Sequence, residues 1–196
     1  MINIPLDRLT YSNNFLSEKE CEIIRDYVIK NESILMNLGE DTYSGIYTHN
    51  QKGSLTGRYV YYNCLNIDVL SSILRPKIKR LIKLFDSDES LYIQCWINTI
   101  RYGENICEHK HIGADETHVY ASGNIFISGD TNPGTNFHFP NKIKNFKNKP
   151  GVMQLFHPSI THGVKTYLNN DVRISIAFDI GNAKMFDDGG VMVKLK

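Results

Sequence analysis

The chain has 196 residues, of which 41% are hydrophobic and 11% aromatic, a composition that is ordinary for a soluble globular protein and excludes a mainly disordered chain. Its 22 basic and 21 acidic residues nearly cancel, so charge points neither to nucleic acid nor to an anionic membrane as a partner. No basic leader with an apolar core opens the sequence, and no apolar run approaches the length of a membrane span. We expect one cytoplasmic domain over residues 1–196.

Residues 1–90 are expected to form a mostly helical support with loops. Ser17 followed three residues later by Glu20 is a capping box, and the apolar residues that follow recur at helical spacing, which predicts a packed helix. Residues 36–57 are rich in Gly, Asn, Ser and Thr and predict a loop, and residues 58–63 predict a strand or part of an active-site lid. A second helical region is expected from about Ile67 to Phe85, with Pro76 at a break or in the first turn of a second segment.

Residues 91–182 read as a succession of short β-like runs separated by turn residues. Lysines recur through residues 142–149, which predicts a basic, solvated hairpin arm. Residues 183–196 form a C-terminal tail, either an edge strand or a frayed end. The expected fold class is mainly β with flanking helices, in which N-terminal helices pack on an antiparallel barrel or jelly roll. The expected strands are Leu91–Tyr102, Tyr120–Ser128, Thr135–Phe139, Gly151–Phe156, His162–Tyr167 and Val172–Ile180.

Three histidines in the β region are candidate metal ligands. His109 and His111 are two residues apart, a spacing that puts both imidazoles on one face of a strand. His162 follows a Pro-Ser turn and precedes a glycine, so it starts a strand that could bring a third imidazole from across the barrel. Three nitrogen donors on rigid strands, with open positions left over, suit a catalytic iron or zinc.

An anion pocket is expected beside the metal. Arg173 and Ser175 lie two residues apart and therefore on one face of the last long strand. An arginine that faces into a barrel is costly unless it meets an anion, and a guanidinium with a serine hydroxyl would bind a carboxylate. A buried structural salt bridge is the alternative. Asn98 and Tyr102 share a face of an earlier strand and could line the same pocket.

Taken together, these motifs resemble the iron(II)- and 2-oxoglutarate-dependent dioxygenases, in particular their prolyl-hydroxylase-like branch in bacterial and phage proteins. The resemblance implies the double-stranded β-helix fold, with a cupin-like barrel. It covers most of the chain from Tyr11 to Ile180. The matching motifs are Trp96-x-Asn98, Tyr102-Gly103, His109-x-His111, Ser122-Gly123, Phe156-x-Pro158-Ser159, His162-Gly163-Val164 and Arg173-x-Ser175.

The resemblance also implies roles. His109, His111 and His162 would hold Fe(II), while Arg173 and Ser175 would bind the distal carboxylate of 2-oxoglutarate. The implied reaction consumes molecular oxygen and 2-oxoglutarate, hydroxylates an unactivated C–H bond of a peptide, protein or small molecule, and releases succinate and CO2. Tyr102 would help to position the cosubstrate.

One position departs from the family pattern. The usual motif is His-x-Asp, and here the third residue is His111. A carboxylate ligand favours the two-histidine, one-carboxylate face that is associated with oxygen activation. Asp115 or Glu116 could supply the carboxylate, in which case His111 would lie off the metal.

A second resemblance leads to another function. Gly103, His109, His111, Glu116 and Gly123 match the first cupin motif in every spacing, and His162 could belong to the second motif, although Ile160 stands where a glycine is expected. A cupin would be an isomerase, a dioxygenase independent of 2-oxoglutarate, or a sugar-binding module. Only the 2-oxoglutarate oxygenase needs the Arg173-x-Ser175 clamp, so that pair favours the oxygenase.

Overall fold

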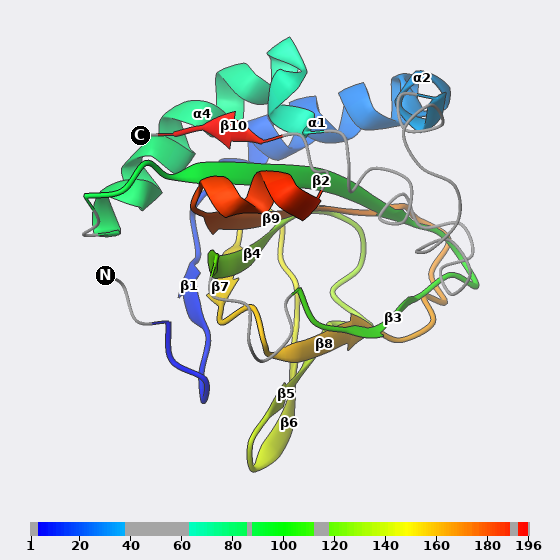
Figure 1. The fold of residues 1–196 in the computed structure, drawn as a ribbon. Helices are drawn as coiled ribbons and strands as arrows, with labels where there is room; N and C mark the ends of the chain where they lie inside the picture. The colour runs from blue at the N-terminus through cyan, green and yellow to red at the C-terminus, as the bar shows by residue number, and fades with distance from the viewer. Residues whose placement is uncertain (1–3, 38–62, 86–87, 112–117, 189–191, 196) are drawn as a thin grey trace.

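Two antiparallel sheets that face each other form the body of the protein in this computed structural model (Figure 1), which describes residues 4–37, 63–85, 88–111, 118–188 and 192–195. The larger sheet has six strands in the order β1-β7-β4-β9-β2-β10, and the smaller has four in the order β3-β8-β5-β6. This is the double-stranded β-helix that the sequence predicts. The strands are β1 Thr10–Ser12, β2 Tyr92–Ile100, β3 Ile106–His109, β4 Val119–Ser128, β5 Thr135–Phe139, β6 Lys142–Phe146, β7 Met153–Phe156, β8 Thr161–Val164, β9 Arg173–Gly181 and β10 Val193–Lys194.

Helices cover the outer face of the larger sheet (Figure 1). The first helix begins with the predicted capping box, in which Ser17 Oγ accepts from the Glu20 amide and the Glu20 carboxylate accepts from the Ser17 amide. Its buried stripe packs into the same core as the second long helix and the sheet. The helical segments are α1 Glu18–Lys30, α2 Glu32–Asn37, η2 Cys64–Asn66, α4 Asp68–Leu81, η3 Ile82–Leu84 and η4 Ala183–Asp188.

Pro76 does not break the second long helix, contrary to the prediction. Helix α4 runs without interruption from Asp68 to Leu81 with Pro76 inside it. Proline removes one helical hydrogen bond, which costs about 3 kcal/mol in a helix interior. Leu74 and Ile78 on either side of Pro76 are fully buried against the sheet, so tertiary packing offsets that cost.

The two faces of strand β9 line different parts of the interior. Ile174, Ile176, Phe178 and Ile180 alternate along it and pack with the helices in the main core. The intervening residues, Arg173, Ser175, Ala177 and Asp179, therefore face the smaller sheet. The predicted alternation of this strand is confirmed, and it gives the space between the sheets a polar lining on one side.

Strands β1 and β6 are additional to the strands expected from the sequence, where residues 142–149 are expected only as a hairpin arm. Strand β3 lies where the His109-x-His111 spacing predicts a strand, but it ends at His109. Strand β10 settles the alternative left open for the tail, because Val193 and Lys194 pair with β2 as an edge strand. Strand β6 pairs with β5, and the two project from the body of the molecule as the expected basic arm (Figure 1), with Lys142 and Lys144 exposed. Strand β1 has only three residues and β6 is largely exposed, so neither shows the buried apolar pattern from which a strand is predicted.

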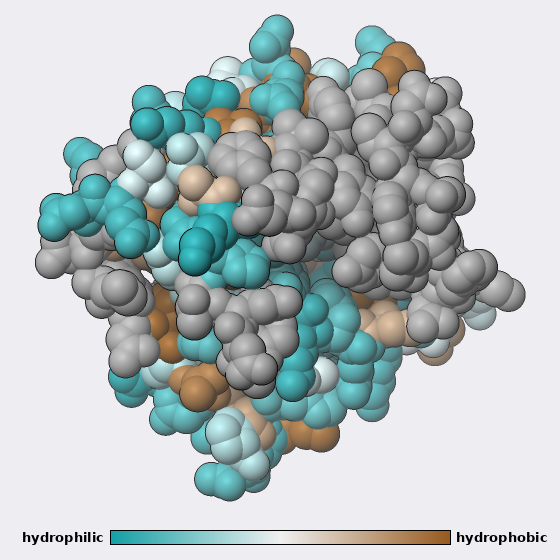
Figure 2. Space-filling view, in the orientation of Figure 1, coloured by the Kyte–Doolittle hydropathy of each residue, from teal (hydrophilic) through white to brown (hydrophobic). Residues whose placement is uncertain are grey.

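The surface seen in Figure 2 is largely hydrophilic where it is described, with hydrophobic residues in small separate groups. Within the described ranges, no helix is long and apolar enough to cross a membrane. The predicted loop at residues 36–57 and the strand or lid at residues 58–63 fall almost entirely outside the described residues.

Gly123, one of the motif glycines, is required by packing. A Cβ built on it would lie 2.1 Å from Cζ of Phe178, a fully buried ring of the main core. We expect Gly123→Ala to lower the free energy of unfolding by roughly 1–3 kcal/mol, the usual cost of overpacking a core. Chemical denaturation of the metal-free protein measures this. The double variant Gly123→Ala/Phe178→Leu should recover part of the loss, and a single variant as stable as the unaltered chain would contradict the prediction.

Candidate metal centre and anion pocket

The smaller sheet brings the three predicted histidines together. Strands β3 and β8 pair so that His109 lies directly opposite His162. His111 lies just beyond the end of β3, where its amide donates to the Pro158 carbonyl at 3.1 Å. The three imidazoles offer ligand atoms that all lie within 4.8 Å of one another, a set that could hold a metal ion. The expectation that both members of the His109-x-His111 pair sit on one strand is thus wrong, but the cluster it predicted is present.

The hydrogen bonds fix which ring nitrogen each histidine offers. His109 Nδ1 lies 2.8 Å from the Cys107 carbonyl oxygen, and His162 Nδ1 lies 3.0 Å from the Ile160 carbonyl oxygen. A carbonyl only accepts, so each Nδ1 carries the proton and each Nε2 keeps its lone pair. His111 Nδ1 lies 2.6 Å from an oxygen of Asp179, which gives it the same tautomer. All three imidazoles therefore present Nε2 as a metal ligand, and the residues fit a bound divalent metal.

Burial keeps the site in the form that binds metal. Desolvation lowers the pKa of His109 to about 4, helped by the nearby His111. Desolvation likewise lowers the pKa of His162 well below its ordinary value, again with repulsion from the neighbouring histidines. Both imidazoles are neutral at pH 7, and a metal binds the neutral imidazole without first displacing a proton.

Aromatic rings surround the histidines and limit their rotation. The His162 ring stacks on Phe137 at a centroid distance of 5.6 Å and meets the edge of Phe156 at 4.7 Å. The His111 ring lies 5.5 Å from Trp96 and 5.8 Å from Phe156. Rigid apolar walls hold the donors in place and lower the local dielectric around any bound ion.

Arg173 is fully buried without an anionic partner among the described residues. Its Nε and Nη1 atoms have no hydrogen-bond partner, and Nη2 reaches only Thr135 Oγ1 at 3.4 Å. Its guanidinium carbon lies 5.3 Å from the centre of the Phe126 ring. Burial lowers the pKa of Arg173 to about 10, which still leaves it charged at pH 7. An unpaired buried cation is costly, and the arrangement suits a bound anion.

Two more unpaired polar atoms lie near this cation. Ser175 Oγ and Asn98 Oδ1 are buried without hydrogen-bond partners, and the two residues lie opposite each other in the pairing of β2 with β9. Asn98 and Thr135 line one cavity together with the three histidines. The cavity is narrow: the space between its lining atoms, counted together with the solvent at its mouth, is about 380 Å³. Asn98, opposite Ser175, and Thr135, bonded to Arg173, therefore border the same cavity as the histidine cluster.

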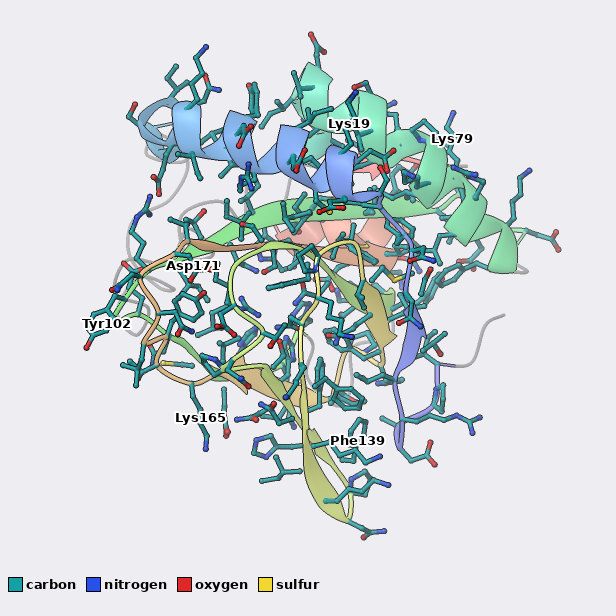
Figure 3. All side chains as sticks on the ribbon, turned by 180° about the vertical axis from the view of Figure 1, so that it is seen from behind. Lys19, Lys79, Tyr102, Phe139, Lys165 and Asp171 are labelled. Carbon is teal, nitrogen blue, oxygen red and sulfur yellow. The ribbon has the colours of Figure 1, made fainter. Side chains whose placement is uncertain are left out.

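Tyr102 does not belong to this pocket, contrary to the expectation. Strand β2 ends at Ile100, and Tyr102 lies in the following turn with 65% of its surface exposed. Figure 3 shows its side chain at the edge of the molecule, directed away from the interior. The alternation of β2 cannot be extended past the end of the strand, which is why the prediction failed. The tyrosine near Arg173 is instead Tyr167, which is fully buried and favours the charged guanidinium.

Asp179 is a site residue that sequence reasoning missed. Its Oδ1 accepts from His111 Nδ1 at 2.6 Å and from Ser122 Oγ at 2.5 Å. The signal was available, since Asp179 continues the inward-facing alternation of Arg173 and Ser175 along β9. The other candidate carboxylates, Asp115 and Glu116, lie outside the described residues.

Solved structures of known proteins share the fold of this chain. The sequence matches no family model and no curated protein. Among solved structures, the viral collagen prolyl hydroxylase of Paramecium Bursaria Chlorella virus-1, in complex with 2OG, superposes with a TM-score of 0.62 at 12% identity over 89% of this chain and 96% of its own.

Two further structures are similar. A prolyl hydroxylase of Trichoplax adhaerens, in complex with a peptide of the oxygen degradation domain of hypoxia inducible factor, has a TM-score of 0.63 at 14% identity over 93% of this chain and 87% of its own. A non-heme alpha ketoglutarate dependent epimerase of nogalamycin biosynthesis has a TM-score of 0.64 at 10% identity over 91% and 79%. The fold is therefore that of the 2-oxoglutarate/Fe(II) oxygenases, as the sequence resemblance predicts.

Proposed function

We propose that the chain is an iron(II)- and 2-oxoglutarate-dependent oxygenase that hydroxylates an unactivated C–H bond. His109, His111 and His162 would hold Fe(II) through their Nε2 atoms. The observation that carries the proposal is Arg173, a buried cation without an anionic partner among the described residues, bonded to a threonine that lines the same cavity as the histidines. A small molecule that chelates the metal and carries a second carboxylate would span the two ends of that cavity.

The chain's own residues would do the binding and positioning. Arg173 and Ser175 would bind the distal carboxylate of 2-oxoglutarate, and Asn98 would contribute a polar contact beside them. The rings of Phe137, Phe156 and Trp96 would exclude water around the metal. Iron, 2-oxoglutarate and molecular oxygen supply the oxidation, in which a substrate C–H bond becomes C–OH while 2-oxoglutarate becomes succinate and CO2.

The structural neighbours favour two substrate classes. Prolyl hydroxylases, one of them solved with a peptide, support a peptide or protein substrate, and the epimerase of nogalamycin biosynthesis supports a small molecule. The proposal therefore covers a peptide or protein substrate and a small-molecule substrate.

The cupin reading loses support relative to the oxygenase. Both families share the barrel, and Glu116, which the cupin motif needs, lies outside the described residues. A cupin that binds metal without 2-oxoglutarate has no need of a buried Arg173. The unpaired guanidinium therefore favours the oxygenase.

The proposal is tested by adding Fe(II) and then 2-oxoglutarate to metal-free protein without oxygen. We expect a visible charge-transfer absorption band that requires both additions, and a slow release of succinate once oxygen is admitted. Zn(II) in place of Fe(II) is the control and should give no band. Stoichiometric iron binding without a band at saturating 2-oxoglutarate would exclude the oxygenase and leave the cupin.

A further inference from the structure

His111 is the one member of the histidine cluster whose Nδ1 faces a carboxylate. His109 and His162 direct Nδ1 at the backbone carbonyls of Cys107 and Ile160, whereas His111 directs it at Asp179 Oδ1, 2.6 Å away. The His111 side chain is 4% exposed and that of Asp179 is 12% exposed, so water screens this contact little.

Ser122 fixes the orientation of this carboxylate. Strands β4 and β9 pair with Ser122 directly opposite Asp179, and Ser122 Oγ donates to Asp179 Oδ1 at 2.5 Å. Both bonds converge on the same oxygen, so the hydroxyl and the imidazole together define the position of the Asp179 side chain. Strand β9 of the larger sheet thereby holds His111, which lies beyond the end of β3 in the smaller sheet.

The contact between His111 and Asp179 bears on the charge around a bound metal. Three imidazole ligands bring no negative charge to a divalent iron in an apolar cavity, whereas iron(II) oxygenase sites usually contain one carboxylate ligand. A carboxylate hydrogen-bonded to the far side of a ligating imidazole raises the basicity of that ligand and locks its orientation. The Asp179 carboxylate is one imidazole away from the position a metal would take.

We propose that Asp179 is a positioning residue that, through His111, supplies the negative charge absent from the three histidines. His111 and Asp179 then act as one composite ligand in place of a directly bound carboxylate. This inference rests on the proposed function in one respect only, namely that the three histidines hold a metal. It requires neither 2-oxoglutarate nor a substrate.

The matched control is a second histidine and carboxylate pair, which lies on the smaller sheet. His138 Nε2 lies 2.7 Å from Glu108 Oε1, and the Glu108 side chain is 56% exposed. His138 is not in the histidine cluster. Glu108→Gln therefore removes the charge from an imidazole contact of the same kind. Glu108 adjoins His109 in β3, but consecutive side chains of a strand point to opposite faces, so its exposed carboxylate lies on the face of the sheet away from the histidine cluster.

The test is anaerobic titration of the metal-free full chain with Fe(II) against a competing chelator, together with the Fe(III)/Fe(II) potential of the loaded protein. We expect Asp179→Asn to weaken Fe(II) binding by about 10- to 100-fold, the usual effect of losing such a partner. The potential should rise, because the lost negative charge stabilised Fe(III) more than Fe(II). Glu108→Gln should change neither quantity. Ser122→Ala, which keeps the charge, should weaken binding less and leave the potential nearly unchanged.

An Asp179→Asn variant with unaltered Fe(II) affinity and potential would overturn the inference, as would an equal shift of the potential in Glu108→Gln. If Asp179→Asn does not fold, Asp179→Ser, which also removes the charge, carries the test, and an affinity and potential equal to those of the unaltered chain then overturn the inference. Failure of the proposed function gives a different result. An unaltered chain that binds Fe(II) but gives no absorption band with 2-oxoglutarate would reject the oxygenase, and Asp179→Asn would still weaken Fe(II) binding.

Discussion

Replacing His162 by glutamine is expected to weaken metal binding at least a hundredfold. The residue supplies one of three nitrogen donors, and loss of a hydrogen-bond partner of a ligand alone costs about 10- to 100-fold, so loss of the ligand itself should exceed that range. Glutamine is preferred to alanine because His162 packs against both Phe137 and Phe156, and a cavity there would destabilise the fold for an unrelated reason.

Metal titration of the metal-free variant measures the loss, and thermal unfolding gives a second readout. A metal that binds only the folded chain adds about 2.7 kcal/mol of stability at a free concentration 100 times its Kd. The unaltered protein should therefore show a rise in Tm on adding Fe(II), and His162→Gln should not. His138→Gln is the control, since it removes an imidazole of the same sheet that lies outside the cluster. Full-affinity binding by His162→Gln would show that the metal lies elsewhere.

The parts of this site that could be predicted depend on local spacing. Alternation along one strand put Arg173 and Ser175 on a common inward face, and that geometry is independent of the rest of the fold. The capping box that begins α1 is likewise a pattern of four consecutive residues. Both are confirmed because the physics that produces them acts over a few residues.

The parts that failed depend on where an element ends or on what lies opposite it. Tyr102 was assigned by extending β2 two residues past its end, and the chain turns before reaching it. His111 joins its cluster from outside β3, held by the carbonyl of Pro158. The role of Asp179 arises from the pairing of β4 with β9, a register that one strand's sequence does not contain.

Arg173 is the residue at which stability and binding are expected to oppose each other. Its guanidinium is fully buried, two of its nitrogens have no hydrogen-bond partner, and the third reaches only a threonine hydroxyl. The energetic cost of burying an unpaired cation falls on the protein without its cosubstrate, and a bound carboxylate would offset it. A structural salt bridge, the alternative interpretation of the sequence, has no carboxylate partner among the described residues.

Arg173→Met therefore separates the two interpretations. Methionine replaces the buried cation with an apolar side chain, and exchanges of this kind are often neutral or stabilising by about 1–4 kcal/mol. We expect the variant without metal or cosubstrate to unfold at the same denaturant concentration as the unaltered chain or a higher one. A purely structural arginine predicts the opposite, a clear loss of stability.

Arg173→Met should also weaken the binding of 2-oxoglutarate. Breaking one buried, hydrogen-bonded charge pair costs about 2–5 kcal/mol, which corresponds to roughly 30-fold or more in affinity. Titration of the iron-loaded protein with 2-oxoglutarate, followed by the visible band, measures this loss, and Fe(II) affinity should change little. Arg101→Met is the control, because Arg101 pairs with Glu32 outside the cavity. The buried cation is destabilising until its anion binds. A variant that is more stable and unable to bind 2-oxoglutarate would therefore show that Arg173 serves ligand binding. A less stable variant with full 2-oxoglutarate affinity would show that Arg173 serves the stability of the fold.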